Sequence, residues 1–143
     1  HAPEFKARYN GYFETLMAHG LDKNSVQENA NSTEDAGSEA IKSLLQNKAL
    51  PQAIVCASDL IAMGVLRALR QAKVNVPDDV AVVGYDNIAV SAYTTPSLTT
   101  VQQNTKLAGE LLVNTLLKAI NNEEVEDYLM PADIIIRQSC GSE

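Results

Sequence analysis

The chain has few of the side chains that bind metals or act as nucleophiles. It contains two cysteines, two histidines and no tryptophan. Cys56 lies in an apolar run and Cys140 in a polar tail, so we expect neither a disulfide framework nor a zinc site. His1 is terminal, and His19 precedes Gly20 at the end of a helical pattern, where a positive charge is favoured. The sequence therefore predicts no metal site.

Motifs that carry enzymatic or nucleotide chemistry are also missing. The chain lacks the G-x-G-x-x-G turn of dinucleotide-binding folds, the glycine–lysine pair of phosphate-binding loops and the G-x-S-x-G nucleophile elbow. No His–Cys, His–Ser or paired-carboxylate constellation is in view. We therefore expect a protein that is not an enzyme and that uses no cofactor.

Charge and hydropathy argue against two classes of partner. The formal net charge is −7, which disfavours direct electrostatic binding of this segment to nucleic acid or to an anionic membrane. No apolar run approaches the roughly 20 residues of a transmembrane helix, and residues 1–6 lack the apolar region of a signal peptide. The length of 143 residues and the hydrophobic content of 45% fit one globular domain, or one lobe of a larger one.

The most regular pattern in the chain covers residues 53–87. Residues 53–57 form a short apolar run that is typical of a buried strand. Ser58 and Asp59 then begin a helix with apolar residues at helical spacing. After a polar turn, a second apolar run covers residues 80–85. This order predicts a right-handed β-α-β crossover between parallel strands.

Polar side chains follow both of these strands. Ser58 and Asp59 come after the first strand, and Asp86 comes after the second. Because ligands bind beyond the carboxyl ends of strands in open parallel sheets, all three are candidate ligand-binding residues. Ser58 and Asp59 can equally serve as a helix cap alone, so both interpretations stay open. A functional role is favoured for Asp86, because no helix that needs a strong cap follows it.

The remaining residues alternate between helical and extended patterns. The pair Ser32 and Asp35 has the spacing of a capping box and predicts a helix N-terminus. The predicted elements are a helix at 4–19, a weak strand at 26–30, a helix at about 32–47, a helical turn at 88–96, a strand at 98–101, a helix at 104–120 and a strand that includes 134–136. This alternation predicts an α/β fold with a parallel sheet. The opening helix suggests that a first strand precedes His1.

A phosphate-accepting receiver domain would also place an aspartate at the end of a strand, as Asp86 is placed here. Such a domain needs an acidic pair after its first strand and a lysine after its last strand. The pair Asp78–Asp79 precedes a strand instead, and no such lysine is found. This interpretation is therefore set aside.

Five short strings share their order and spacing with a known family. They are ASDLIAMG (57–64), VPDDV (76–80), VGYDN (83–87), PSLTTV (96–101) and IRQS (136–139), and RYNGY (8–12) adds a sixth. With these strings the chain resembles the LacI/GalR family of bacterial transcription regulators. The resemblance extends over nearly the whole chain.

The resemblance implies an incomplete lobe of a type I periplasmic-binding-protein-like fold, a parallel sheet in a three-layer α/β arrangement. Residues 1–101 would form the C-terminal lobe, with its first strand missing, and residues 102–143 would cross to the other lobe and return. A DNA-binding headpiece would lie upstream, outside this chain. A regulator of this kind is expected in the cytoplasm, without a membrane partner.

The resemblance also implies that a small molecule, expected here to be a carbohydrate, binds between two lobes. A carboxylate and a guanidinium suit such an effector, because they accept from and donate to hydroxyl groups. The implied effector-binding residues are Arg8, Ser58, Asp59, Asp86 and Gln103. Members that stack an aromatic ring on the ligand carry Trp or Phe near the position of Ser32, so this chain departs from them there.

Self-association as a homodimer is implied as well. The helix around residues 61–69 and the turn at residues 89–93 correspond to segments that pair two protomers in the family. The implied interface residues are Ile61, Val65, Leu69 and Tyr93. The same helix face could instead only cover the chain's own sheet. Two other functions stay open, a periplasmic sugar-binding protein of a transport system and a nucleobase-responsive regulator of the same family.

Overall fold

A computed structural model of the chain describes residues 3–21 and 31–142, and the predicted strand at residues 26–30 lies outside this part. Its elements are α1 (Pro3–Ala18), α2 (Glu34–Gln46), β1 (Ala53–Val55), α3 (Asp59–Gln71), β2 (Ala81–Val83), the 3₁₀ helix η1 (Ala89–Tyr93), β3 (Thr100–Gln103), α4 (Thr105–Ile120), β4 (Ala132–Ile135) and the 3₁₀ helix η2 (Gln138–Cys140). Within the described part, each predicted helix and strand is present, with shifts of a few residues at the ends.

The sheet is parallel in one half and antiparallel in the other. β1 and β2 pair in parallel, with Ala53 opposite Ala81, and α3 connects them as predicted. β3 and β4 pair antiparallel, with Thr100 opposite Ile135. A parallel bridge between Val83 and Thr99 links the two halves. β4 departs from the parallel arrangement predicted for the sheet, because the chain reverses after α4 and returns antiparallel beside β3.

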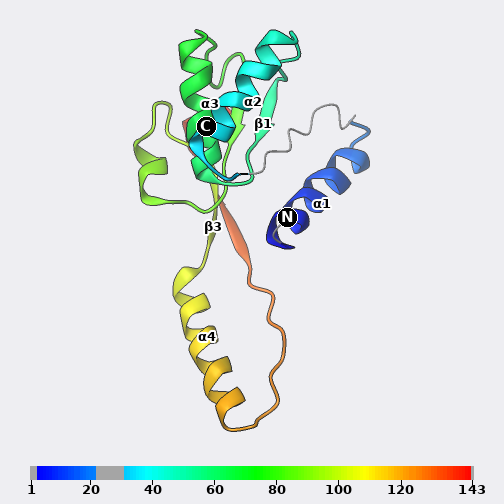
Figure 1. The fold of residues 1–143 in the computed structure, drawn as a ribbon, viewed down its shortest axis with the longest axis vertical. Helices are drawn as coiled ribbons and strands as arrows, with labels where there is room; N and C mark the ends of the chain where they lie inside the picture. The colour runs from blue at the N-terminus through cyan, green and yellow to red at the C-terminus, as the bar shows by residue number, and fades with distance from the viewer. Residues whose placement is uncertain (1–2, 22–30, 143) are drawn as a thin grey trace.

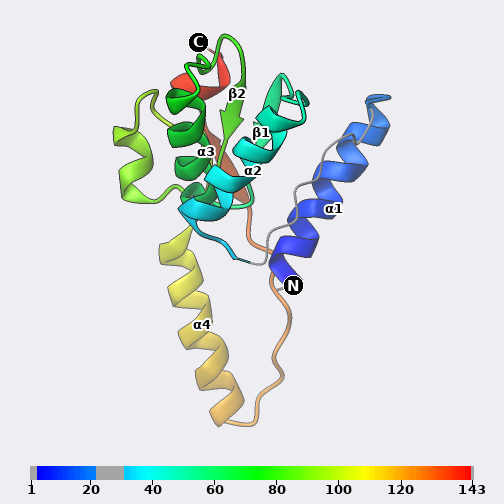
Figure 2. The same cartoon turned by 45° about the horizontal axis from the view of Figure 1, so that its top comes forward.

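The elements form a compact body and an extension. In Figure 1, α2 and α3 lie side by side against β1 and β2, while α4 stands at the opposite end, joined to the body by β3 and β4. Figure 2 shows α1 separated from α4 and next to the body. No residue of α4 is buried. The assignment of residues 102–143 to a crossover between lobes stays a prediction. Among the described residues, none of the helices combines the length and the apolar content needed to cross a membrane.

The apolar core lies between the helix pair and the strands. α2 and α3 supply most of it, and β2 and the segment before β3 close it. Its buried members are Ile41, Leu44, Cys56, Ala62, Val65, Leu66, Ala68, Leu69, Val80, Val82 and Leu98. The body of the chain therefore has its own core without α4.

This packing corrects part of the predicted dimer interface. Val65 is 2% exposed and Leu69 is fully buried, because α2 covers this face of α3. Ile61 is half-buried and packs against the same core. Tyr93 differs from these three, since its side chain is 84% exposed on η1. Val65 and Leu69 thus belong to the interior of one protomer, whereas the interface role of Ile61 and Tyr93 stays a prediction.

Two glycines allow α2 and α3 to approach each other closely. A Cβ atom at Gly64 of α3 would overlap the backbone carbonyl of Glu34, and one at Gly37 of α2 would overlap the backbone carbonyl of Ile61. The two glycines therefore permit close approach of α2 and α3 within the same chain.

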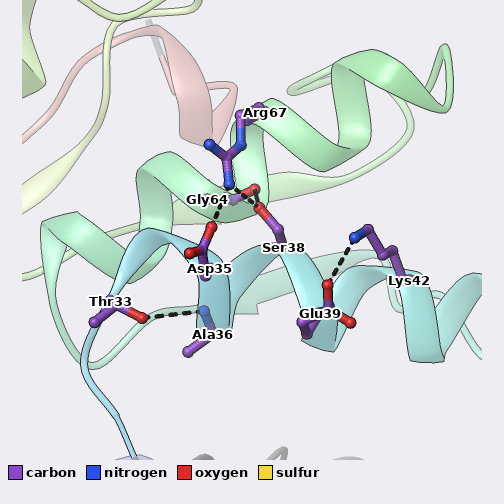
Figure 3. A network of polar contacts seen from close by, with 8 residues as sticks. All are labelled: Thr33, Asp35, Ala36, Ser38, Glu39, Lys42, Gly64 and Arg67. Carbon is purple, nitrogen blue, oxygen red and sulfur yellow. Dashed lines mark hydrogen bonds and ion pairs between the residues drawn. The ribbon is translucent and has the colours of Figure 1, made fainter.

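Polar contacts join the two helices beside these glycines (Figure 3). The Arg67 guanidinium donates to Asp35 Oδ1 and to Ser38 Oγ, both at 3.0 Å. The Ser38 hydroxyl donates in turn to the Gly64 carbonyl at 3.0 Å. Arg67 and Asp35 are largely exposed, so their ion pair contributes little, whereas the Ser38 bond is buried. We call these contacts of Arg67, Asp35, Ser38 and Gly64 the α2–α3 clamp.

The N-cap of α2 is one residue later than predicted. Thr33 Oγ1 accepts from the backbone N–H of Ala36 at 3.3 Å, as Figure 3 shows. Ser32, the predicted cap, lies outside the helix. Because Thr and Ser have similar capping preferences, the sequence alone could not choose between adjacent hydroxyl residues.

The close helix packing gives a first prediction. We expect Gly64→Ala to lower the free energy of unfolding by about 1–3 kcal/mol or more, because its methyl group must displace the Glu34 backbone. Gly109→Ala in α4 is the matched control, since no atom lies within 4 Å of its added Cβ. The control is expected to be neutral or stabilising by up to about 1 kcal/mol. Urea denaturation measures both, and equal effects would contradict the packing described here.

Candidate functional site

Two charged side chains meet at the carboxyl ends of β1 and β2. Arg8, on α1, donates from Nη1 to the Ala57 carbonyl at 2.7 Å. Its Nη2 lies 3.6 Å from Oδ1 of Asp86. The Arg8 and Asp86 side chains are 21% and 36% exposed, so each is partly buried and partly open to solvent. The structure thus brings together two of the predicted site residues from distant parts of the chain.

The Arg8 guanidinium rests on the ring of Tyr85. Its central carbon lies 3.7 Å from the ring centroid, and the Phe5 ring is 5.3 Å away. A guanidinium over an aromatic face is attracted by the ring quadrupole. Tyr85 was not among the predicted site residues. The sequence offered one signal for Tyr85, its position next to Asp86. Nothing in the sequence indicated that α1 would lie over the Tyr85 ring.

The Asp86 carboxyl group is partly desolvated. Burial raises its pKa above the ordinary value, and the negative charge of Asp59 adds to the rise, while the Arg8 guanidinium opposes it. The backbone of Asp86 has φ of +111° and that of Asn87 +49°, and the Asp86 N–H donates to the Val101 carbonyl at 2.9 Å. Asp86 is therefore held in an unusual backbone conformation at the edge of the sheet.

Asp59 and Ser58 point into the protein. Asp59 is fully buried, and its oxygens accept from the Thr100 hydroxyl at 2.6 Å and from the Ile88 N–H at 2.9 Å. Ser58 is 6% exposed, and its Oγ accepts from the Ile61 N–H at 3.4 Å as the N-cap of α3. The predicted cap is confirmed for Ser58. Both side chains are buried and bonded inside the fold, and a direct contact of either with an effector stays a prediction.

Gln103 ends β3, where its backbone is opposite Ala132 of β4. The glutamine that contacts the site turn is its neighbour Gln102, whose Oε1 accepts from Asn87 Nδ2 at 3.0 Å. Successive side chains of a strand point to opposite faces of the sheet, so Gln102 and Gln103 lie on different faces. The role of Gln103 in effector binding stays a prediction.

The chemistry available at this edge is binding. The Arg8 fork offers donors and the Asp86 carboxylate offers acceptors, a pairing that suits a small molecule with both kinds of polar group. Burial raises the pKa of the nearby Cys56 to about 12, with Asp59 adding to the rise, so its thiol stays protonated and unreactive. Across residues 3–21 and 31–142, no cluster of three or more His, Cys, Asp or Glu side chains could hold a metal ion.

A parallel β-α-β unit is typical of α/β domains, whose ligands bind beyond the carboxyl ends of the strands. The comparison with protein families agrees with this architecture. The profile of the periplasmic binding protein-like domain matches residues 1–140.

Relatives and solved structures narrow this class. The transcriptional repressor PurR of Glaesserella parasuis is 34% identical over 94% of this chain and 42% of its own length. The lac repressor dimer bound to operator and the anti-inducer ONPF has a TM-score of 0.89 at 26% identity, covering 94% of this chain and 47% of that one. The complex of the transcriptional regulator CelR with cellobiose has a TM-score of 0.85 at 34% identity, covering 92% and 41%.

The chain belongs to the periplasmic binding protein-like family, in the form found in LacI-type transcriptional regulators. The family resemblance inferred from the short sequence strings is thereby confirmed, as is the fold class. The chain spans about two-fifths of the length of the curated relatives it matches, 42% in the case of PurR. Those relatives are transcriptional repressors.

The buried carboxylate of Asp59 gives a second prediction. We expect Asp59→Ala to lower the free energy of unfolding by about 2–4 kcal/mol, because it leaves the Ile88 N–H and the Thr100 hydroxyl without their acceptor. Thr100→Val should cost less, and the double variant should cost less than the sum of the two single variants. Asp78→Asn, an exposed carboxylate at the opposite end of β2, is the control. Additive effects of Asp59→Ala and Thr100→Val in chemical denaturation would contradict this coupling.

Proposed function

We propose that this chain is the effector-sensing part of a LacI-type transcriptional repressor, and that its effector is a carbohydrate bound against Arg8 and Asp86. The observation that supports this most directly is the open pairing of these two side chains at the carboxyl ends of β1 and β2. Both side chains are partly exposed, whereas Ser58 and Asp59 are buried.

A carbohydrate suits this arrangement because each hydroxyl both donates and accepts. A carboxylate can accept from two neighbouring hydroxyls, and a guanidinium can donate to the oxygens of a diol. The likeness to the CelR–cellobiose complex supports this class of effector. The likeness to PurR keeps a nucleobase effector as the second candidate, since the edge of a heterocycle also offers donors and acceptors to such a pair.

The proposed mechanism is a shift between two conformations. An effector that contacts both lobes favours the closed form, and the closed and open forms place the DNA-binding headpieces differently. The headpiece, the other lobe and the operator lie outside this chain. The charge of −7 agrees with DNA contacts being made elsewhere in a cytoplasmic homodimer.

The coding sequence upstream of residue 1 separates a regulator from a transport protein. A helix-turn-helix segment followed by another β-α lobe would support the repressor. A signal peptide without a headpiece would instead indicate a periplasmic sugar-binding protein and would contradict the proposed function.

A third prediction concerns Asp86. We expect Asp86→Asn to weaken effector binding by about tenfold to 150-fold, the loss of a charge-assisted hydrogen bond of about 1.5–3 kcal/mol. Binding should also weaken as the pH falls toward the raised pKa of this carboxyl group, because the ionised form accepts from the effector. Isothermal titration calorimetry measures the affinities of the full-length wild-type and Asp86→Asn proteins. The ligands tested are D-ribose, D-galactose, cellobiose, hypoxanthine and guanine.

Stability should respond in the opposite way to binding. A raised pKa in the folded chain means that the ionised carboxylate is less favourable there than in the unfolded chain, so this contribution destabilises the fold at pH values above the ordinary pKa. Asp86→Asn is therefore expected not to lower the free energy of unfolding at neutral pH. Asp78→Asn is the control, and unchanged affinity in Asp86→Asn would refute the site.

A fourth prediction concerns the proposed homodimer. Tyr93 on η1 is 84% exposed and Val90 beside it is 48% exposed, an apolar surface that two protomers could share. We expect Tyr93→Asp to shift the full-length protein toward monomer in sedimentation-velocity experiments. Tyr128→Asp, another exposed tyrosine, serves as the control. A dimer of wild-type strength in Tyr93→Asp would place the interface elsewhere.

A further inference from the structure

The turn that carries Asp86 has an unfavourable backbone. Asp86 and Asn87 have φ of +111° and +49°, values that non-glycine residues rarely adopt. Two successive residues of this kind persist only where the surrounding structure fixes them. Since Asp86 reaches Arg8 from this turn, whatever fixes the turn also sets the geometry of the candidate site.

One side of the turn is fixed through its backbone. The N–H groups of residues 86–88 donate in order to the Val101 carbonyl, the Thr100 hydroxyl and the Asp59 carboxylate, at 2.9, 3.2 and 2.9 Å. These acceptors come from β3 and from the first turn of α3. Every backbone donor of the turn is therefore satisfied by a different acceptor.

The other side of the turn is fixed through the side chain of Asn87. Its Oδ1 accepts from Nη2 of Arg137 at 2.7 Å, and its Nδ2 donates to Gln102. The second arm of the same guanidinium, Nη1, donates to the Leu98 carbonyl at 2.7 Å and to the Ser91 hydroxyl at 3.1 Å. Arg137 thus links the turn to η1 and to the segment that enters β3.

Arg137 faces neutral acceptors only. The ion pairs in the described part of the chain involve Arg8, Lys42 and Arg67. Arg137 is half-buried and has no carboxylate partner among the described residues, so no ion pair explains its role. Its planar guanidinium instead binds three acceptors at fixed angles. Lysine, a single charged point on a flexible stem, could not reproduce it. Arg137 also lies in the IRQS string, to which the proposed function assigns no role.

We propose that Arg137 is a positioning residue for effector binding, which fixes Asn87 and thereby holds the Asp86 carboxylate beside Arg8. The residue acts from the far end of the chain and touches neither member of the pair. The inference rests on the proposed function for its biological meaning. Its physical content, the coupling between Arg8 and Asp86, can be measured without any effector.

The charge-conserving variant Arg137→Lys tests this role. We first measure how far Arg8→Met raises the pKa of Asp86, using carbon-13 NMR titration of aspartate carboxyl groups in the full-length protein that contains this chain. The rise reports the electrostatic coupling between the two side chains, because the Arg8 guanidinium lowers the pKa of Asp86. Asp86→Asn identifies the resonance. The measurement is then repeated with Arg137→Lys present in both proteins. In that background we expect Arg8→Met to raise the pKa of Asp86 by less than half as much as in the wild-type background.

Arg67→Lys is the matched control. It makes the same chemical change at another guanidinium, the one in the α2–α3 clamp (Figure 3). We expect Arg67→Lys to lower the free energy of unfolding while the effect of Arg8→Met on the pKa of Asp86 stays at its wild-type size. This separates positioning of Asp86 from a general loss of stability.

An unchanged effect of Arg8→Met in the presence of Arg137→Lys would overturn the proposal, whatever the change in stability. If Arg137→Lys does not fold, Asn87→Gly replaces it. Glycine tolerates the positive φ but removes the acceptor of Arg137, so the same reduced coupling is expected.

A binding experiment connects the coupling to function. We expect Arg137→Lys to weaken binding of D-ribose, cellobiose or hypoxanthine, whichever binds the wild-type protein, at least fivefold more than Arg67→Lys does. If none of the three binds the wild-type protein, the proposed function loses its support, and the pKa measurement still decides the role of Arg137.

Discussion

The buried carboxylate of Asp59 is the constraint on which the arrangement of this sheet edge depends. It starts α3, accepts from the backbone N–H of Ile88 beyond β2, and accepts from the Thr100 hydroxyl on β3. A Cβ at Gly84 would overlap this carboxylate, so the residue that follows β2 must approach it without a side chain. A single charged group thereby joins three segments of the chain. Its charge also raises the pKa values of Cys56 and Asp86.

The polar residues at the carboxyl ends of β1 and β2 fall into two groups, those buried within the fold and those partly exposed to solvent. Asp59 and Ser58 are buried and accept hydrogen bonds inside the fold. Arg8 and Asp86 keep a loose ion pair at 3.6 Å, on a backbone turn that costs free energy to hold. Such a turn persists because its neighbours fix it. The partly desolvated carboxylate of Asp86 is thus held on this turn at some cost in stability.

The apolar surfaces divide in a similar way. The apolar face of α3 is buried against α2, because Gly37 and Gly64 allow the two backbones to approach closely. On α4 the helical spacing of leucines predicts an amphipathic helix, and the helix is present, yet Leu112, Leu116 and Ile120 are each more than half exposed. Helical periodicity therefore indicated an apolar face in both cases. It did not indicate whether that face belongs to the core of this chain.

Local sequence patterns were enough to predict the helices and strands, the β-α-β unit and a cap at Ser58, since these depend mainly on residues a few positions apart. Asp86 became a candidate from its place after a strand, and Arg8 from the family resemblance. Packing in three dimensions was needed to show that Asp59 turns inward, that Thr33 rather than Ser32 caps α2, and that β4 runs antiparallel to β3. It alone placed Arg8 over Tyr85 and Arg137 against Asn87. Burial, strand direction and contacts between distant residues depend on packing in three dimensions, which periodicity and local hydrogen bonding do not encode.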